Sequence, residues 1–238
     1  MKNIDVRGTI CPNDEKEIYE WFGIEATAPK DVNKALIEAD GDDITVLVNS
    51  GGGDLKAGNE MYSLLKRYEG ATTAEITGFA ASAATLVCCG TDKCVANPGI
   101  QYMIHNVSSI MGGDHRDMET IAEVLQTADV SIANIYRLKT GLTEKELLKM
   151  MSHGTQNNGL WMDAKKAKEY GFVDEIKGDD GSLAGPITIY NSLFATVLNE
   201  EMKERFREAK LGNEKTELKK QQMARLALLK LKGGMRNV

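Results

Sequence analysis

Residues 73–86 read TAEITGFAASAATL, a sequence that predicts a strand leading directly into a helix. The first five residues are typical of a strand, and the remainder are small and mostly alanine, with Ser82 among them. A serine is a poor nucleophile unless a base accepts its proton and backbone N–H groups stabilise the developing oxyanion. Two other segments could supply these groups, NSGGGD at 49–54 and MIHN at 103–106. The three segments together predict one site with a nucleophile, oxyanion donors and a base.

These segments resemble the ClpP serine peptidases, and most of all the ClpP-like head maturation proteases of phages. The resemblance covers about residues 4 to 176. It rests on four motifs in a fixed order, which are NSGGG at 49–53, GFAASA at 78–83, MIH at 103–105 and AKEYGFVDE at 167–175. The resemblance implies an α/β fold of the ClpP/crotonase type, with repeated ββα units and a helical handle. We expect this domain to span 1–190 and a charged helical tail to span 191–238.

The resemblance assigns Ser82 as the nucleophile and His105 as the base that accepts its proton. It places the oxyanion donors at the backbone N–H groups of Gly52, Gly53 and Ala83. Taken alone, Ser82 would be read as a packing residue and His105 as a core histidine. The ordered motifs favour the catalytic interpretation. The glycines do not form a phosphate-binding Walker loop, because no Lys-Ser or Lys-Thr pair follows them.

The third member of the triad is where the sequence departs from the family pattern. Counting back from Gly171, the position of the orienting carboxylate is occupied by Gly159. The neighbouring Asn158 carries an amide that could hold a histidine tautomer, although it cannot stabilise imidazolium as a carboxylate does. We therefore predict Asn158 as the third member, and Asp163 as a helix cap.

Composition limits the other classes of function. The four cysteines lack the spacing of a zinc site, so we expect reduced core residues, no metal and no cofactor. The chain shows no signal peptide and no membrane span, which predicts a cytoplasmic protein. Residues 200–238 hold 11 Lys and Arg against 6 Asp and Glu, while the rest of the chain is acidic. Acidic residues interleave this basic tail and few aromatics accompany it, so nucleic-acid binding is not favoured.

Periodicity predicts where the helices and strands lie. The expected strands are 4–10, 44–49, 73–77, 93–96, 102–105, 172–176 and 186–190. The expected helices are 14–22, 29–39, 55–68, 80–89, 116–139, one capped by Thr143 with Glu146, and a short one that opens at 161–164 and closes at Gly171. Within 192–238 the pattern is helical, with a break at 212–213.

The predicted function is a serine endopeptidase that cleaves phage capsid or scaffold proteins during head maturation. The alternatives are a bacterial-type ClpP subunit working with an ATPase, a catalytically degenerate assembly protein, and an acyl-CoA enzyme of the crotonase type. The resemblance also implies a homo-oligomeric ring, a heptamer or double heptamer. Apolar residues at helical spacing between 107 and 151 favour this assembly, namely Ile121, Val124, Leu125, Ile132, Ile135, Tyr136, Leu138, Leu147 and Leu148.

Overall fold

The computed structural model describes residues 2–154, 159–178 and 198–211. Residues 1–197 and 198–238 form two separate compact units. In the second unit, residues 200–211 are helical, and the Asn199 side chain accepts a hydrogen bond from the Met202 N–H at 2.8 Å. The predicted strand at 186–190, the predicted helix break at 212–213 and Asn158 lie outside the described residues.

The first unit is built on an eight-stranded sheet. Parallel strands follow the order β2-β1-β3-β4-β5-β8. Strand β6 pairs in parallel with the carboxyl-terminal end of β4, and β7 runs antiparallel to β6. The strands are β1 (Lys2–Ile10), β2 (Ala26–Thr27), β3 (Ile44–Gly53), β4 (Thr72–Ala81), β5 (Lys93–Ala96), β6 (Gln101–Ile104), β7 (Leu160–Asp163) and β8 (Glu175–Ile176). In the central strand β3, Ile44, Val46 and Val48 are buried on one face, whereas Leu47 and Asn49 on the opposite face are only partly buried.

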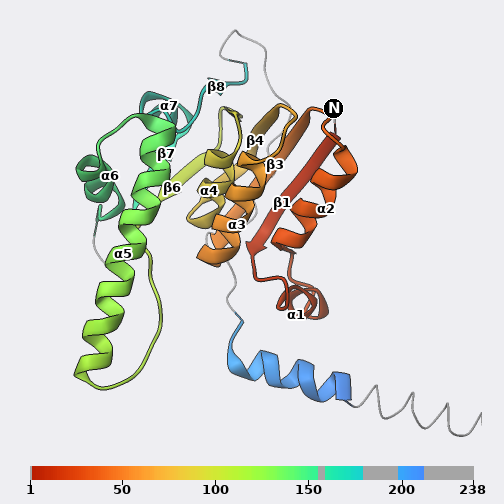
Figure 1. The fold of residues 1–238 in the computed structure, drawn as a ribbon, viewed down its shortest axis with the longest axis vertical. Coiled ribbons are helices and arrows are strands. Elements are labelled where there is room, and N and C mark those ends of the chain that lie inside the picture. Colours follow the sequence, from red (N-terminus) through yellow and green to blue (C-terminus); the bar gives the residue numbers. More distant parts are fainter. Residues whose placement is uncertain (1, 155–158, 179–197, 212–238) are drawn as a thin grey trace, which may run out of the picture. The chain divides into compact units, whose positions relative to one another are not determined.

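Seven helices connect the strands in the described part of this unit. They are α1 (Lys16–Trp21), α2 (Pro29–Ala39), α3 (Leu55–Lys66), α4 (Ala83–Gly90), α5 (His115–Thr140), α6 (Glu144–Met151) and α7 (Ala164–Glu169). Figure 1 shows α2, α3 and α4 side by side against the strands β1, β3 and β4, with the long α5 standing beside them next to α6. None of the described helices is long and apolar enough to cross a membrane.

Small residues allow α3 and α4 to approach closely. A Cβ added at Gly58 would lie 3.0 Å from the Ala83 side chain, and one added at Gly90 would lie 3.0 Å from the Tyr62 Cα. Every side chain of α4 is buried. The alanine-rich sequence after Ser82 is therefore required by the packing of this helix.

Local signals in the sequence located several elements well. The long helix predicted at 116–139 is α5. Thr143 caps α6, with its side chain accepting from the Glu146 N–H, and Asp163 caps α7 by accepting from the Lys166 N–H. All four cysteines are buried free thiols, as predicted.

The strand predicted at 172–176 is limited to β8 at Glu175–Ile176. Three other predicted boundaries were wrong because strand pairing extends an element. Gly51 to Gly53 lie beyond the predicted end of the strand at residue 49, yet they continue β3, where Gly52 and Gly53 pair with the end of β1. Ala80 and Ala81 are not helical, since β4 continues to Ala81 alongside β6. The segment at 161–162 belongs to β7, paired with β6, and α7 begins only at Ala164.

Candidate active site

The nucleophile candidate lies at a sharp turn between β4 and α4. Ser82 adopts φ 54° and ψ −128°, one of two described non-glycine residues with positive φ. Such a conformation costs about 1–3 kcal/mol and persists only where the surroundings enforce it. The Ser82 N–H donates to the Met103 carbonyl at 3.0 Å, and its own carbonyl accepts from the Thr85 hydroxyl at 2.6 Å. These bonds hold the serine side chain at the carboxyl end of the sheet.

His105 reaches Ser82 because their strands are neighbours. Ala81 on β4 pairs with Met103 on β6, so both parallel strands end at the same edge of the sheet. The His105 Nε2 and Ser82 Oγ lie 2.7 Å apart, within hydrogen-bonding distance. Both side chains are only partly buried. This is the nucleophile and base arrangement that the sequence predicts.

The glycines of β3 complete the same edge. A Cβ at Gly52 would lie 2.6 Å from the Ala81 carbonyl oxygen, 2.7 Å from the Ser82 Cβ and 2.8 Å from the Ala83 nitrogen. Gly52 has φ +89° and Gly53 has φ +145°, conformations that side chains disfavour. Only glycine therefore lets β3 run this close to the serine turn.

A cavity of about 630 Å³ opens beside Ser82 and His105. Gly53 and Ala83 also line it. Most of its wall is apolar and comes from α5 and neighbouring segments, namely Leu55, Leu86, Val107, Met111, Ile121, Val124, Leu125, Ala128, Ile132 and Tyr136. This volume is in the usual range of a ligand-binding cleft.

Residues 26–180 match the family profile described as Clp protease. The chain belongs to the Clp protease family. It is 30% identical over 182 residues to the ATP-dependent Clp protease proteolytic subunit 2 of Tropheryma whipplei, covering 73% of this chain and 98% of that protein. It is also 31% identical over 136 residues to the ATP-dependent Clp protease proteolytic subunit 1 of Streptomyces avermitilis, covering 56% of this chain and 60% of that protein.

Among solved structures, a mutant ClpP1 from Listeria monocytogenes is similar to this chain with a TM-score of 0.60. The two are 24% identical, and the match covers 75% of this chain and 93% of the other. This likeness shows a shared α/β ClpP fold.

Within this Clp-family fold, the predicted oxyanion donors differ in their surroundings. The Gly52 N–H donates to the Ser50 Oγ at 3.1 Å, and Gly52 is buried. Gly53 and Ala83 line the cavity, and Ala83 is the first residue of α4, where backbone N–H groups have no partner within the helix. Gly53 and Ala83 thus lie at the cavity beside Ser82 and His105, and Gly52 packs closely against the serine turn.

Gly159, which the sequence resemblance places at the position of the family carboxylate, lies beside His105. A Cβ at Gly159 would lie 2.5 Å from the His105 Cβ, and Gly159 has φ +67°. Its backbone therefore fills the space beside the histidine. In the described residues, no group of three or more His, Cys, Asp or Glu side chains is placed to hold a metal ion.

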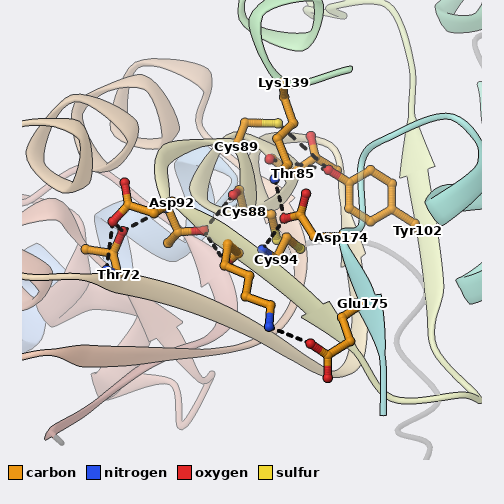
Figure 2. Close-up of polar contacts among 12 residues, drawn as sticks. Thr72, Thr85, Cys88, Cys89, Asp92, Cys94, Tyr102, Lys139, Asp174 and Glu175 are labelled. Carbon is orange, nitrogen blue, oxygen red and sulfur yellow. Dashed lines mark hydrogen bonds and ion pairs between the residues drawn. The ribbon is translucent and has the colours of Figure 1, made fainter. Parts of the chain in front are cut away.

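Sequence reasoning missed a polar connection that fixes α5 against the nucleophile turn. Thr85, whose hydroxyl lies against the Ser82 carbonyl, also forms a hydrogen bond of 2.6 Å with the buried Tyr136 hydroxyl on α5. At the end of α5, Lys139 forms an ion pair with Asp174, which in turn accepts from the Cys94 N–H at 2.6 Å. Figure 2 shows this second group of contacts around Cys88, Cys94 and Lys139. Threonine and tyrosine far apart in sequence give no local signal for such a pair.

Proposed function

We propose that this Clp-family chain is a serine endopeptidase. The observation that carries the proposal is the 2.7 Å contact between Ser82 Oγ and His105 Nε2, on a positive-φ serine at the mouth of an apolar cavity. A packing serine does not need a strained backbone and a histidine partner. A nucleophile needs both its exposure and its base.

The proposed reaction proceeds through two acyl transfers. Ser82 Oγ attacks the substrate carbonyl carbon while His105 Nε2 accepts the hydroxyl proton, and the C–N bond then breaks as His105 returns that proton to the leaving amine. Water attacks the resulting ester with His105 again accepting a proton, and Ser82 leaves with that proton restored. We assign the oxyanion contacts to the Gly53 and Ala83 N–H groups, with Gly52 setting their approach.

For the substrate, we propose phage capsid or scaffold protein processed during head maturation, on the strength of the sequence resemblance. A second candidate is a proteolytic subunit that works with an ATPase. The names of the two bacterial relatives, each called an ATP-dependent Clp protease proteolytic subunit, favour this second candidate. In both cases the substrates are proteins.

We also propose a homo-oligomeric ring, heptameric or doubled. The apolar residues predicted for the handle divide in the structure. Ile132, Tyr136 and Leu147 are buried within the chain, and others line the cavity. Leu138 and Val124, the second of which also lines the cavity, remain exposed, with relative exposures of 74% and 61%. Exposed apolar side chains on one long helix favour contact with neighbouring subunits.

Labelling with a fluorophosphonate tests the peptidase proposal directly. We expect one adduct on Ser82 in the folded wild type and none in Ser82→Ala. A folded, assembled wild type that forms no adduct would contradict the proposal and favour the acyl-CoA or degenerate alternatives. Those alternatives do not need an activated serine.

The substrate is tested by co-expression. Cleavage of co-expressed capsid protein by the wild type and not by Ser82→Ala supports head maturation. If capsid protein stays intact while an added Clp ATPase starts degradation of unfolded protein, the ATPase-dependent alternative is correct. The predicted role of Asn158 is tested with Asn158→Ala, which should impair processing if its amide holds the His105 tautomer.

A further inference from the structure

Asp129 is a carboxylate on the inner face of α5. Ile132, Ala133 and Tyr136 follow it at helical spacing, and all three are buried against the body of the unit. Asp129 itself is partly buried, whereas acidic residues such as Glu123 on the same helix are exposed. A carboxylate on a buried stripe requires polar or charged partners, because burial disfavours its charge.

The first partner of Asp129 is the loop that carries the proposed base. Its Oδ1 accepts a hydrogen bond from the Val107 N–H at 2.7 Å. Val107 lies two residues after His105 and lines the cavity. Asp129 therefore fixes the backbone that leads away from the imidazole.

The imidazole of His105 lies near enough to act on the Asp129 carboxylate electrostatically. Burial raises the pKa of the Asp129 carboxyl, while the Val107 hydrogen bond and the positive charge of a protonated His105 act in the opposite direction. The charged side chains that line the described cavity, apart from His105, are Asp54 and Lys56, from the start of α3. Asp54 uses its carboxylate to cap α3 by accepting from the Ala57 N–H at 2.7 Å.

The position of Asp129 is tied to the nucleophile through its own helix. Two turns after Asp129, Tyr136 forms a hydrogen bond with Thr85, and Thr85 donates to the Ser82 carbonyl. Ser82 in turn contacts His105. The Val107 N–H bond to Asp129 joins the same helix to the loop after His105, so α5 is bonded both to the serine turn and to this loop. These contacts hold the carboxylate at a fixed place relative to Ser82 and His105.

We propose that Asp129 is the positioning residue for His105, holding the loop that follows the imidazole and stabilising the imidazolium that forms during acyl transfer. The inference rests on the proposed peptidase function and assigns the charge that Gly159 and Asn158 cannot supply. Asp129 approaches from α5, on a different element from the loop before β7. An amide at 158 and a carboxylate at 129 could both orient the His105 ring, but only the carboxylate would stabilise the positive charge of the imidazolium.

The test is Asp129→Asn, which keeps an oxygen for the Val107 N–H and removes the negative charge. The matched control is Glu123→Gln, which removes the same charge from an exposed position of α5. We expect Asp129→Asn to lower the rate of fluorophosphonate reaction at Ser82 by about 10²- to 10⁴-fold. Glu123→Gln should react at the wild-type rate.

The pH profile separates an electrostatic role from a merely structural one. His105 must be neutral to accept the serine proton, so the labelling rate rises as the pH increases through the pKa of the imidazole. This rise is the acid limb of the pH profile. A neighbouring negative charge favours imidazolium and raises that pKa, so we expect Asp129→Asn to move the limb down by about one pH unit. Burial raises the pKa of the Asp129 carboxyl, so keeping it ionised at neutral pH costs some folding stability. Asp129→Asn relieves this cost and keeps an oxygen for the Val107 N–H, so the variant should be at least as stable as the wild type.

An NMR titration of His105 gives a readout that does not depend on activity. The chain has three histidines, and substitution of His115 and His153 identifies the His105 signals. A lower His105 pKa in Asp129→Asn and an unchanged one in Glu123→Gln support the proposal. Equal labelling rates and equal titration in all three proteins would overturn it. A wild type that shows the Asp129-dependent titration but no Ser82 adduct would instead contradict the peptidase function.

Discussion

Replacing Gly52 with alanine should disable the site while leaving its catalytic side chains in place. The added Cβ would lie 2.6 Å from the Ala81 carbonyl oxygen, 2.7 Å from the Ser82 Cβ and 2.8 Å from the Ala83 nitrogen. Non-bonded heavy atoms are normally separated by about 3.5 Å, so β3 and the serine turn must move apart by roughly 0.7–0.9 Å. Two of the three atoms belong to the backbone, which cannot rotate out of the way.

That displacement sets the expected size of the effect. A misplacement of about 1 Å costs about 100-fold in rate, which corresponds to about 2.7 kcal/mol of activation free energy. The unfolding free energy should also fall. The backbone conformation alone costs an alanine about 1–2 kcal/mol, and the overpacking adds about 1–3 kcal/mol.

Gly41 offers a matched control for the cost of placing alanine in this backbone conformation. It has φ +85°, close to the +89° of Gly52, and a Cβ there would meet nothing within 4 Å. Gly41→Ala should therefore lose about 1–2 kcal/mol of stability with no change in Ser82 reactivity. We would measure the fluorophosphonate rate constant and urea unfolding for both variants. Equal rates in Gly52→Ala and Gly41→Ala would refute the packing argument.

Two other predictions concern assembly and the buried thiols. Light scattering coupled to size exclusion should give the wild type a mass several times the 26.1 kDa of one chain. Leu138→Asp places a charge at an exposed position of α5 and should lower that mass. An active wild-type monomer at micromolar concentration would contradict the ring. The native protein should resist iodoacetamide at neutral and mildly alkaline pH, because the thiolate is the reactive form and burial raises the pKa of Cys11 to about 11 and that of Cys89 to about 12. Denatured protein should alkylate at all four cysteines, and rapid alkylation of the native protein would show that the thiols are not buried.

Short-range patterns located the elements that are held by short-range interactions. Thr143 and Glu146 lie three residues apart and bond to each other, so the start of α6 is visible in the sequence. The same is true of Asp163 and the start of α7. The sequence also predicted the contact between Ser82 and His105, through motifs shared with a family whose strands converge at one edge.

Boundaries that depend on distant pairing could not be placed this way. Ala80 and Ala81 have helical propensity, yet they are strand because they pair with Tyr102 and Met103 on β6. Gly51 to Gly53 have the composition of a turn, yet they continue β3 because β1 lies beside them. In both cases the tertiary pairing outweighs the local preference.

Asp129 shows how a functional residue can be hidden among similar ones. The α5 sequence contains several acidic residues, and a helix with so many charges is usually solvated on all but one stripe. Periodicity alone does place Asp129 on the stripe of Ile132, Ala133 and Tyr136, which is the stripe that the structure buries. What the sequence does not show is the approach of that stripe to the loop after His105, 24 positions earlier in the chain. That approach depends on the docking of α5 through Tyr136 and Thr85. Asp129, the carboxylate that we assign to His105, is therefore in place only when α5 is docked. For this reason its role is tested with Asp129→Asn, which changes the charge and leaves the contact between Tyr136 and Thr85 intact.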